Sequence, residues 1–193
     1  MSLEEEQKLV ERAKADPQEF GVVFDLYYPK IVSYVVHRVG DAAAGQDITS
    51  IVFFKAWHGL DKFEWRGLPF SAWLYRIASN EVNSYFRQKK YQPTSLDALF
   101  EETGFELPDE HDVASDRIAF EDALARHEDF VLVQALVLEL PLKYQEVIAL
   151  RFFEKQPVKD IAAITGKNIN TVKSLLARGT AKLQRNFNKQ RAL

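Results

Sequence analysis

Apolar residues recur at three- and four-residue steps along most of the chain, the spacing that gathers side chains on one face of an α-helix. Three such stripes occupy residues 20–35, 48–57 and 73–82, with a break at 41–45 and a loop at 59–69 between them. Strict alternation, the pattern typical of strands, is not found. The pattern therefore predicts an all-α fold.

Residues 91–128 interrupt this helical pattern. Pro93, Gly104 and Pro108 break any periodicity, and Asp and Glu dominate the composition. Such a segment buries too little apolar surface to offset the entropy lost on ordering. We therefore expect two small helical domains, residues 1–90 and 129–193, joined by an acidic linker at 91–128.

The second domain contains a helix-turn-helix pattern. A short apolar stripe at 158–165 ends at Gly166, which suits the residue after a helix C-terminus. Asn168 can cap the following helix, whose inner face carries Val172 and Leu176. In this motif the second helix lies in the major groove of DNA, so we expect a duplex reader here.

Polar side chains follow the outer face of that second helix. Asn and Arg can form paired hydrogen bonds with base edges, and Lys and Ser can reach phosphates or bases. A helical hairpin with a solvated basic face is the alternative. The candidate duplex-binding residues are Asn168, Asn170, Thr171, Lys173, Ser174, Arg178 and Lys182.

The charge distribution favours a polyanionic partner for this end of the chain. The net charge is only −3. Residues 91–142 nevertheless contain 13 acidic and 2 basic residues, whereas residues 143–193 contain 3 acidic and 11 basic ones. A basic segment of this kind is typical of nucleic-acid binding, with a solvated tail as the alternative.

Aromatic and basic residues are interleaved between residues 63 and 91. Proteins hold unstacked single strands with aromatic faces beside cations. Trp73 belongs to an apolar stripe and is expected to pack in the core, whereas Trp65 lies in the loop with no evident core role. Core packing of these rings is the alternative to a nucleic-acid site. The candidate residues are Trp65, Arg66, Arg76, Asn80, Arg87, Lys89 and Lys90.

Enzymatic and membrane functions find no support in the sequence. There is no glycine-rich phosphate loop, no His-Glu-x-x-His pair and no cysteine, and the four histidines are scattered. We expect no catalytic residue, no metal, no cofactor and no small-molecule substrate. No run of about 18 apolar residues and no signal peptide is present, so we expect a cytoplasmic protein without a membrane span.

Several stretches together resemble a known family. Residues 24–31 (FDLYYPKI), 47–57 (DITSIVFFKAW) and 63–80 (FEWRGLPFSAWLYRIASN) are similar to region 2 of extracytoplasmic-function sigma factors. Residues 140–154 (LPLKYQEVIALRFFE), with Asp-Ile-Ala at 160–162 and Thr-Val-Lys-Ser at 171–174, resemble region 4. These factors are the compact bacterial sigma factors that keep only regions 2 and 4.

The resemblance implies partners and roles. The helix with Asp47, Phe54 and Trp57 would dock on core RNA polymerase. Residues 63–90 would open and read the −10 element of promoter DNA, and the helix at 168–182 would read the −35 element. An anti-sigma factor is a further partner that the family admits.

Three positions depart from the family pattern. Ser50 and Ile51 stand where Gln-Glu is usual, Ser84 replaces a common Asp, and Leu175 replaces a common Arg. We expect a sigma factor without catalysis of its own. A stand-alone helix-turn-helix regulator and a sigma-like protein-binding module, favoured by Ile51 and Leu175, are the alternatives.

Overall fold

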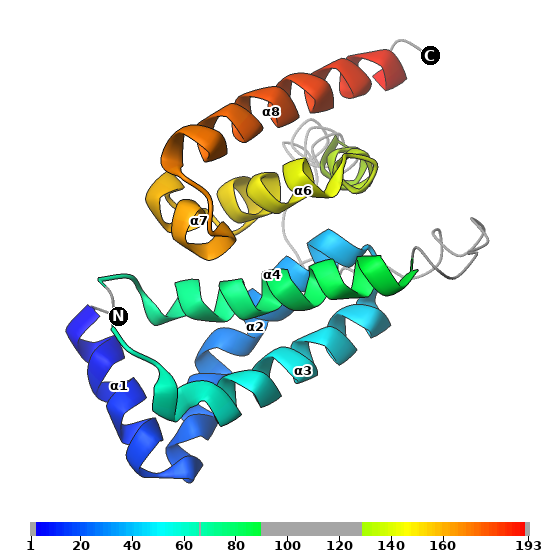
Figure 1. Ribbon diagram of the computed structural model, residues 1–193. Coiled ribbons are helices and arrows are strands. Elements are labelled where there is room, and N and C mark those ends of the chain that lie inside the picture. The colour runs from blue at the N-terminus through cyan, green and yellow to red at the C-terminus, as the bar shows by residue number, and fades with distance from the viewer. Residues whose placement is uncertain (1–2, 66, 90–128, 192–193) are drawn as a thin grey trace, which may run out of the picture.

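The computed structural model describes residues 3–65, 67–89 and 129–191, and every regular element within them is helical (Figure 1). The first half contains α1 (Leu3–Ala15), α2 (Phe20–Val39), α3 (Ala42–Gly59) and α4 (Phe70–Lys89). The second half contains a helix over residues 129–138, α6 (Leu142–Ile148), α7 (Val158–Thr165) and α8 (Ile169–Arg191). The prediction of an all-α fold is confirmed. The predicted acidic linker lies outside the described residues.

The boundary between α2 and α3 is sharper than the apolar pattern predicts. Gly40 ends α2 in the left-handed region, with φ at 73°, and the Asp41 side chain accepts a hydrogen bond from Ala44 N at 2.9 Å. The expected break at 41–45 is therefore wrong in extent, because α3 already begins at Ala42. Gly45 lies inside α3, where a Cβ would stand 2.5 Å from Val36 Cγ2, so the glycine permits close packing on α2.

Helices α2, α3 and α4 enclose the core of the first half. Its fully buried side chains include Ile31, Val52, Phe70 and Leu74. Helix α1 packs along α2, where the Tyr27 hydroxyl donates a hydrogen bond to the buried Glu6 carboxylate. Burial and the nearby Glu6 charge raise the pKa of Tyr27, so its hydroxyl stays protonated as the donor. The N-terminal helix is thereby fixed to the three-helix core.

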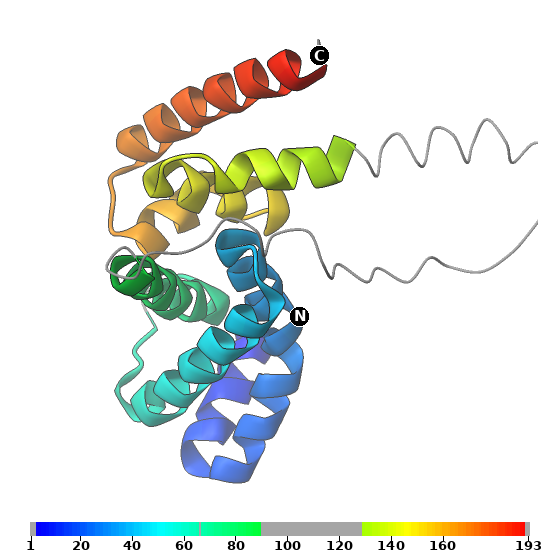
Figure 2. The same cartoon turned by 90° about the vertical axis from the view of Figure 1, so that its right-hand side faces the viewer.

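In the second half, α6 packs against α8 and continues into a π-helical turn (Ala149–Phe153). A Cβ at Gly179 of α8 would stand 2.9 Å from Ile148 Cδ1, so this glycine allows the two helices to approach closely. Helix α7 lies between this unit and the first half (Figure 2). The two halves therefore contact each other, chiefly where α7 packs on α4.

Candidate nucleic-acid interface

The helix-turn-helix is present with the local features that the sequence indicates. Gly166 follows α7 with a positive φ of 67°. The Asn168 side chain accepts a hydrogen bond from Thr171 N at 2.7 Å, which satisfies an amide in the first turn of α8. Val172 is fully buried beneath the turn. These three residues fix the angle between α7 and α8.

The outer face of α8 is open. All seven candidate residues on and beside it are exposed, and within the described residues Lys173, Arg178 and Lys182 form no ion pair. Their charges and donors are therefore available to a ligand. The exposed residues are Asn168, Asn170, Thr171, Lys173, Ser174, Arg178 and Lys182.

Leu175 has a packing role that explains its apolar character. Its side chain is half-buried and packs against the main hydrophobic core. A charged residue would lose this contact, whereas the neighbouring Ser174 and Arg178 remain exposed. The leucine therefore leaves most of the polar face of α8 intact.

The loop between α3 and α4 is held by a cation from α1. Lys14 Nζ donates a hydrogen bond to the Phe63 carbonyl at 3.0 Å and lies 5.9 Å from the centre of the Phe63 ring. The Phe63 ring contacts Phe70 and Trp73, with centroid distances of 5.1 and 5.0 Å. Nothing in the sequence pattern links Lys14 to this loop, because the two are separated by 49 residues.

Trp65 is less available than its place in the loop suggests. The indole is half-buried, packs edge-on against Phe63 at 5.2 Å, and has a buried Nε1. The expectation that this ring has no core role is therefore wrong, because the loop folds back onto the aromatic residues of α4.

A hollow of about 410 Å³ opens beside this loop. Phe63 and Trp73 supply its rings, Lys62 and Arg76 supply positive charge, and Glu64 supplies one carboxylate. This volume falls within the range of about 300–1,000 Å³ that is usual for small-ligand pockets. Trp73, expected from the sequence to be a core residue, is half-buried and lines the hollow.

The remaining candidates in the first half lie along α4. Arg76, Asn80 and Arg87 are exposed, and Lys89 lies 5.6 Å from the centre of the Tyr85 ring. The side chains of Arg66 and Lys90 lie outside the described residues. The structure thus brings Arg76 to the hollow and leaves Asn80 one turn further along the same helix.

A separate apolar surface covers one side of α3. The exposed fractions are 45% for Ile51, 60% for Phe54 and 47% for Trp57. Asp47, one turn before Ile51, is also exposed. Large rings this exposed are typical of protein–protein contacts, so the surface suits a protein partner.

Among the described residues, no group of His, Cys, Asp or Glu side chains could hold a metal ion. None of the helices in that part of the chain is both long enough and apolar enough to cross a membrane.

Comparison with protein families decides the identity of the fold. A model described as Sigma-70 region 2 matches residues 23–91, and one described as Sigma-70, region 4 matches residues 130–183. The chain belongs to the sigma-70 family. Between them the two matches include α3, α4 and the helix-turn-helix.

Individual relatives place this sigma factor in the extracytoplasmic-function (ECF) branch. It is 32% identical to the ECF RNA polymerase sigma factor SigW of Bacillus subtilis, over 89% of this chain and 90% of SigW. It is also 32% identical to the ECF RNA polymerase sigma factor BldN of Streptomyces coelicolor, over 92% of this chain and 64% of BldN. The chain thus spans about two thirds of BldN's length and nearly all of SigW's. It is a sigma factor that acts in transcription initiation.

Solved structures of low sequence identity share the fold of this sigma factor. CnrH, in a complex with the cytosolic domain of CnrY, aligns with a TM-score of 0.67 at 22% identity, covering 95% of this chain and 97% of CnrH. RpoE of Bartonella quintana, in a complex with the anti-sigma factor NepR, aligns with a TM-score of 0.63 at 23% identity, covering 89% and 98%. Sigma factors are typically DNA-recognition proteins without an enzymatic activity.

Proposed function

We propose that this sigma factor reads promoter DNA at two surfaces of different kinds. The exposed face of α8 would read the −35 duplex, and the hollow beside α4 would capture an unstacked base of the −10 element. Core RNA polymerase would bind the apolar face of α3. This division assigns residues 1–90 to region 2, 91–128 to the linker and 129–193 to region 4.

The hollow is the observation that carries the proposal. A base must leave the duplex before it can stack on a protein ring, and an extruded base needs an aromatic wall with cations for the adjoining phosphates. Trp73 provides the wall, and Lys62 and Arg76 provide the charge. Asn80 carries a donor and an acceptor for a base edge on the same helix.

The same role also implies a location and a class of partner. The ECF relatives are RNA polymerase factors, so we place this protein in the cytoplasm with the polymerase and give it no catalysis of its own. The solved complexes of RpoE with the anti-sigma factor NepR and of CnrH with CnrY support an anti-sigma factor as a further partner.

The contribution of α8 can be tested with the holoenzyme and a −35 duplex. Lys173→Ala and Arg178→Ala should each weaken binding, since each removes an exposed cation from the reading face. Where a phosphate contact is lost, the slope of log K against log salt should become shallower by about 1. Lys143→Ala removes the same charge from α6 and is the matched control. Unchanged affinity and slope in both α8 variants would contradict the assignment.

A further inference from the structure

Helix α1 contacts the loop that leads from α3 into α4 (Figure 1). Near the end of α1, Lys14 Nζ donates a hydrogen bond to the Phe63 carbonyl at 3.0 Å and forms an ion pair with Glu11 at 3.0 Å. The Lys14 side chain is only 21% exposed, and its ammonium lies 5.9 Å from the centre of the Phe63 ring. The cation is therefore committed to the loop and to its own helix rather than presented to a ligand.

We propose that Lys14 is a positioning residue for strand capture. It holds the loop in the conformation that forms the hollow, and it thereby promotes promoter opening without touching DNA. The inference rests on the proposed function of the hollow. It extends that function to α1, a helix none of whose described residues lines the hollow.

The Lys14 bond supports the loop where its own helical structure ends. The Phe63 amide donates a hydrogen bond to the Leu60 carbonyl at 3.0 Å, which closes a 3₁₀ turn after α3. Beyond Phe63, the described residues 64–65 and 67–69 form no helix before α4 begins. Lys14 thus bonds the last backbone carbonyl of the turn, and it does so from a helix 49 residues away in the chain.

Phe63 is central to the wall of the hollow. Its ring lines the hollow together with Trp73, and the two ring centres are 5.0 Å apart. Lys62 and Glu64, its neighbours in the chain, line the hollow as well. A shift of the Phe63 backbone would therefore displace one aromatic face and two charged side chains at once. A strand that binds only the ordered wall loses affinity in proportion to the fraction of molecules that have it.

Helix α1 provides a fixed support for this bond. Val10 is fully buried and Leu9 is 6% exposed, and both belong to the main hydrophobic core. The buried Glu6 carboxylate accepts a hydrogen bond from the Tyr27 hydroxyl. The Tyr27 ring in turn lies 5.6 Å from the ring of Phe70, the first residue of α4. Helix α1 is thus anchored on the core before it reaches the loop.

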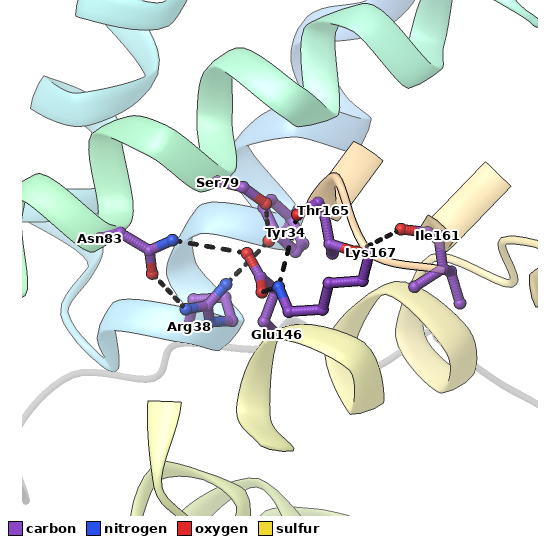
Figure 3. Close-up of polar contacts among 8 residues, drawn as sticks. All are labelled: Tyr34, Arg38, Ser79, Asn83, Glu146, Ile161, Thr165 and Lys167. Atoms are coloured by element: carbon purple, nitrogen blue, oxygen red, sulfur yellow. Dashed lines mark hydrogen bonds and ion pairs between the residues drawn. The ribbon is translucent and has the colours of Figure 1, made fainter. Parts of the chain in front are cut away.

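The Lys14 bond does not depend on how the two halves are arranged. Figure 3 shows a polar network that joins the halves through Glu146 of α6, which accepts a hydrogen bond from Asn83 of α4 at 3.4 Å. Neither Lys14 nor Phe63 belongs to that network. Because both partners of the Lys14 bond lie in the first half, the loop keeps this support in any arrangement of the halves.

Three lysine variants of the full chain separate positioning from simple packing. Lys14→Met keeps an apolar stem over the Phe63 ring and removes the donor, whereas Lys14→Arg keeps a donor and the charge. Lys8→Met removes the same charge from an exposed position on α1 and is the matched control. The holoenzyme of each variant is tested for affinity to the single-stranded non-template −10 segment of a promoter that the parent transcribes, and to the matching −35 duplex. Hydrogen exchange of residues 60–65 reports the order of the loop without DNA.

Lys14→Met should bind the single strand about tenfold more weakly, the loss expected for a hydrogen bond from a charged group, while its affinity for the −35 duplex stays at the parent value. Exchange at 60–65 should be faster in this variant. Lys14→Arg should recover both properties, and Lys8→Met should match the parent. Parent-like strand affinity in Lys14→Met, or equal losses for strand and duplex, would overturn the inference. Trp73→Ala separates the two claims: if that variant also binds the strand normally, the proposed function of the hollow fails, whereas a defect confined to Trp73→Ala overturns the positioning role alone.

Discussion

Replacing Phe54 with alanine is expected to lower the affinity for core RNA polymerase by about 30-fold or more. Phe54 is 60% exposed on α3, and Trp57 beside it is 47% exposed. Exposed aromatic anchors of this kind typically cost about 2–4 kcal/mol when truncated at the centre of an interface. Because the ring contributes little to the core, the melting temperature should change little. Surface-plasmon resonance against immobilised core polymerase measures the affinity.

Two companion variants sharpen this result. Asp47→Arg reverses a charge at the start of the same face and should also prevent co-purification with the polymerase. Leu3→Ala removes a side chain of similar exposure from α1, 56% exposed, and should bind as the parent does. Parent-like binding by both Phe54→Ala and Asp47→Arg would show that the contact lies elsewhere.

Replacing Trp73 with alanine is expected to reduce promoter opening by about 5- to 150-fold, because stacking of one base on an aromatic ring is worth about 1–3 kcal/mol. Replacing Arg76 with alanine should also reduce opening, because it removes a cation for the adjoining phosphates. Arg76 is exposed and should lose opening without losing stability. Trp73 packs on Phe63 and Phe70 and should lose some of each. Permanganate reactivity of promoter thymines in the polymerase complex measures opening.

Trp65→Ala is the informative comparison, because the sequence and the structure give this ring different roles. Its packing on Phe63 and its buried indole nitrogen predict a lower melting temperature with a smaller effect on opening. Asn80→Ala, on the exposed side of α4, should show the opposite behaviour. Full opening in the Arg76 and Asn80 variants, with a strong defect in the Trp65 variant, would show that the unstacked base binds at Trp65 in the loop rather than along α4.

The helices could be predicted because their cause is local. An apolar stripe determines which face of α2, α3 or α4 is buried, whatever element that face packs against. Gly166 and Asn168 likewise specify the turn between α7 and α8 through their own backbone and side-chain bonds. The start of α3, which the pattern placed wrongly, involves Gly45, whose role depends on contact with Val36 of another helix.

The hollow and the contact between the two halves could not be predicted because their causes are not local. Lys14 bonds the backbone of Phe63, 49 residues away, and so shapes the loop that leaves Trp73 at the hollow. Tyr75 and Glu154 are 79 residues apart. Periodicity shows only that Trp73 faces inward on α4, and it cannot show whether the inner side is a core, a cavity or a second domain.

Promoter-directed transcription tests the account most directly. Core RNA polymerase from the source organism, fragmented genomic DNA from the same organism and this chain should together yield transcripts that begin at a discrete set of sites. Phe54→Ala should abolish these transcripts, and Arg178→Ala should reduce them. Tight sequence-specific duplex binding without polymerase, together with no transcript that depends on the chain, would contradict the account.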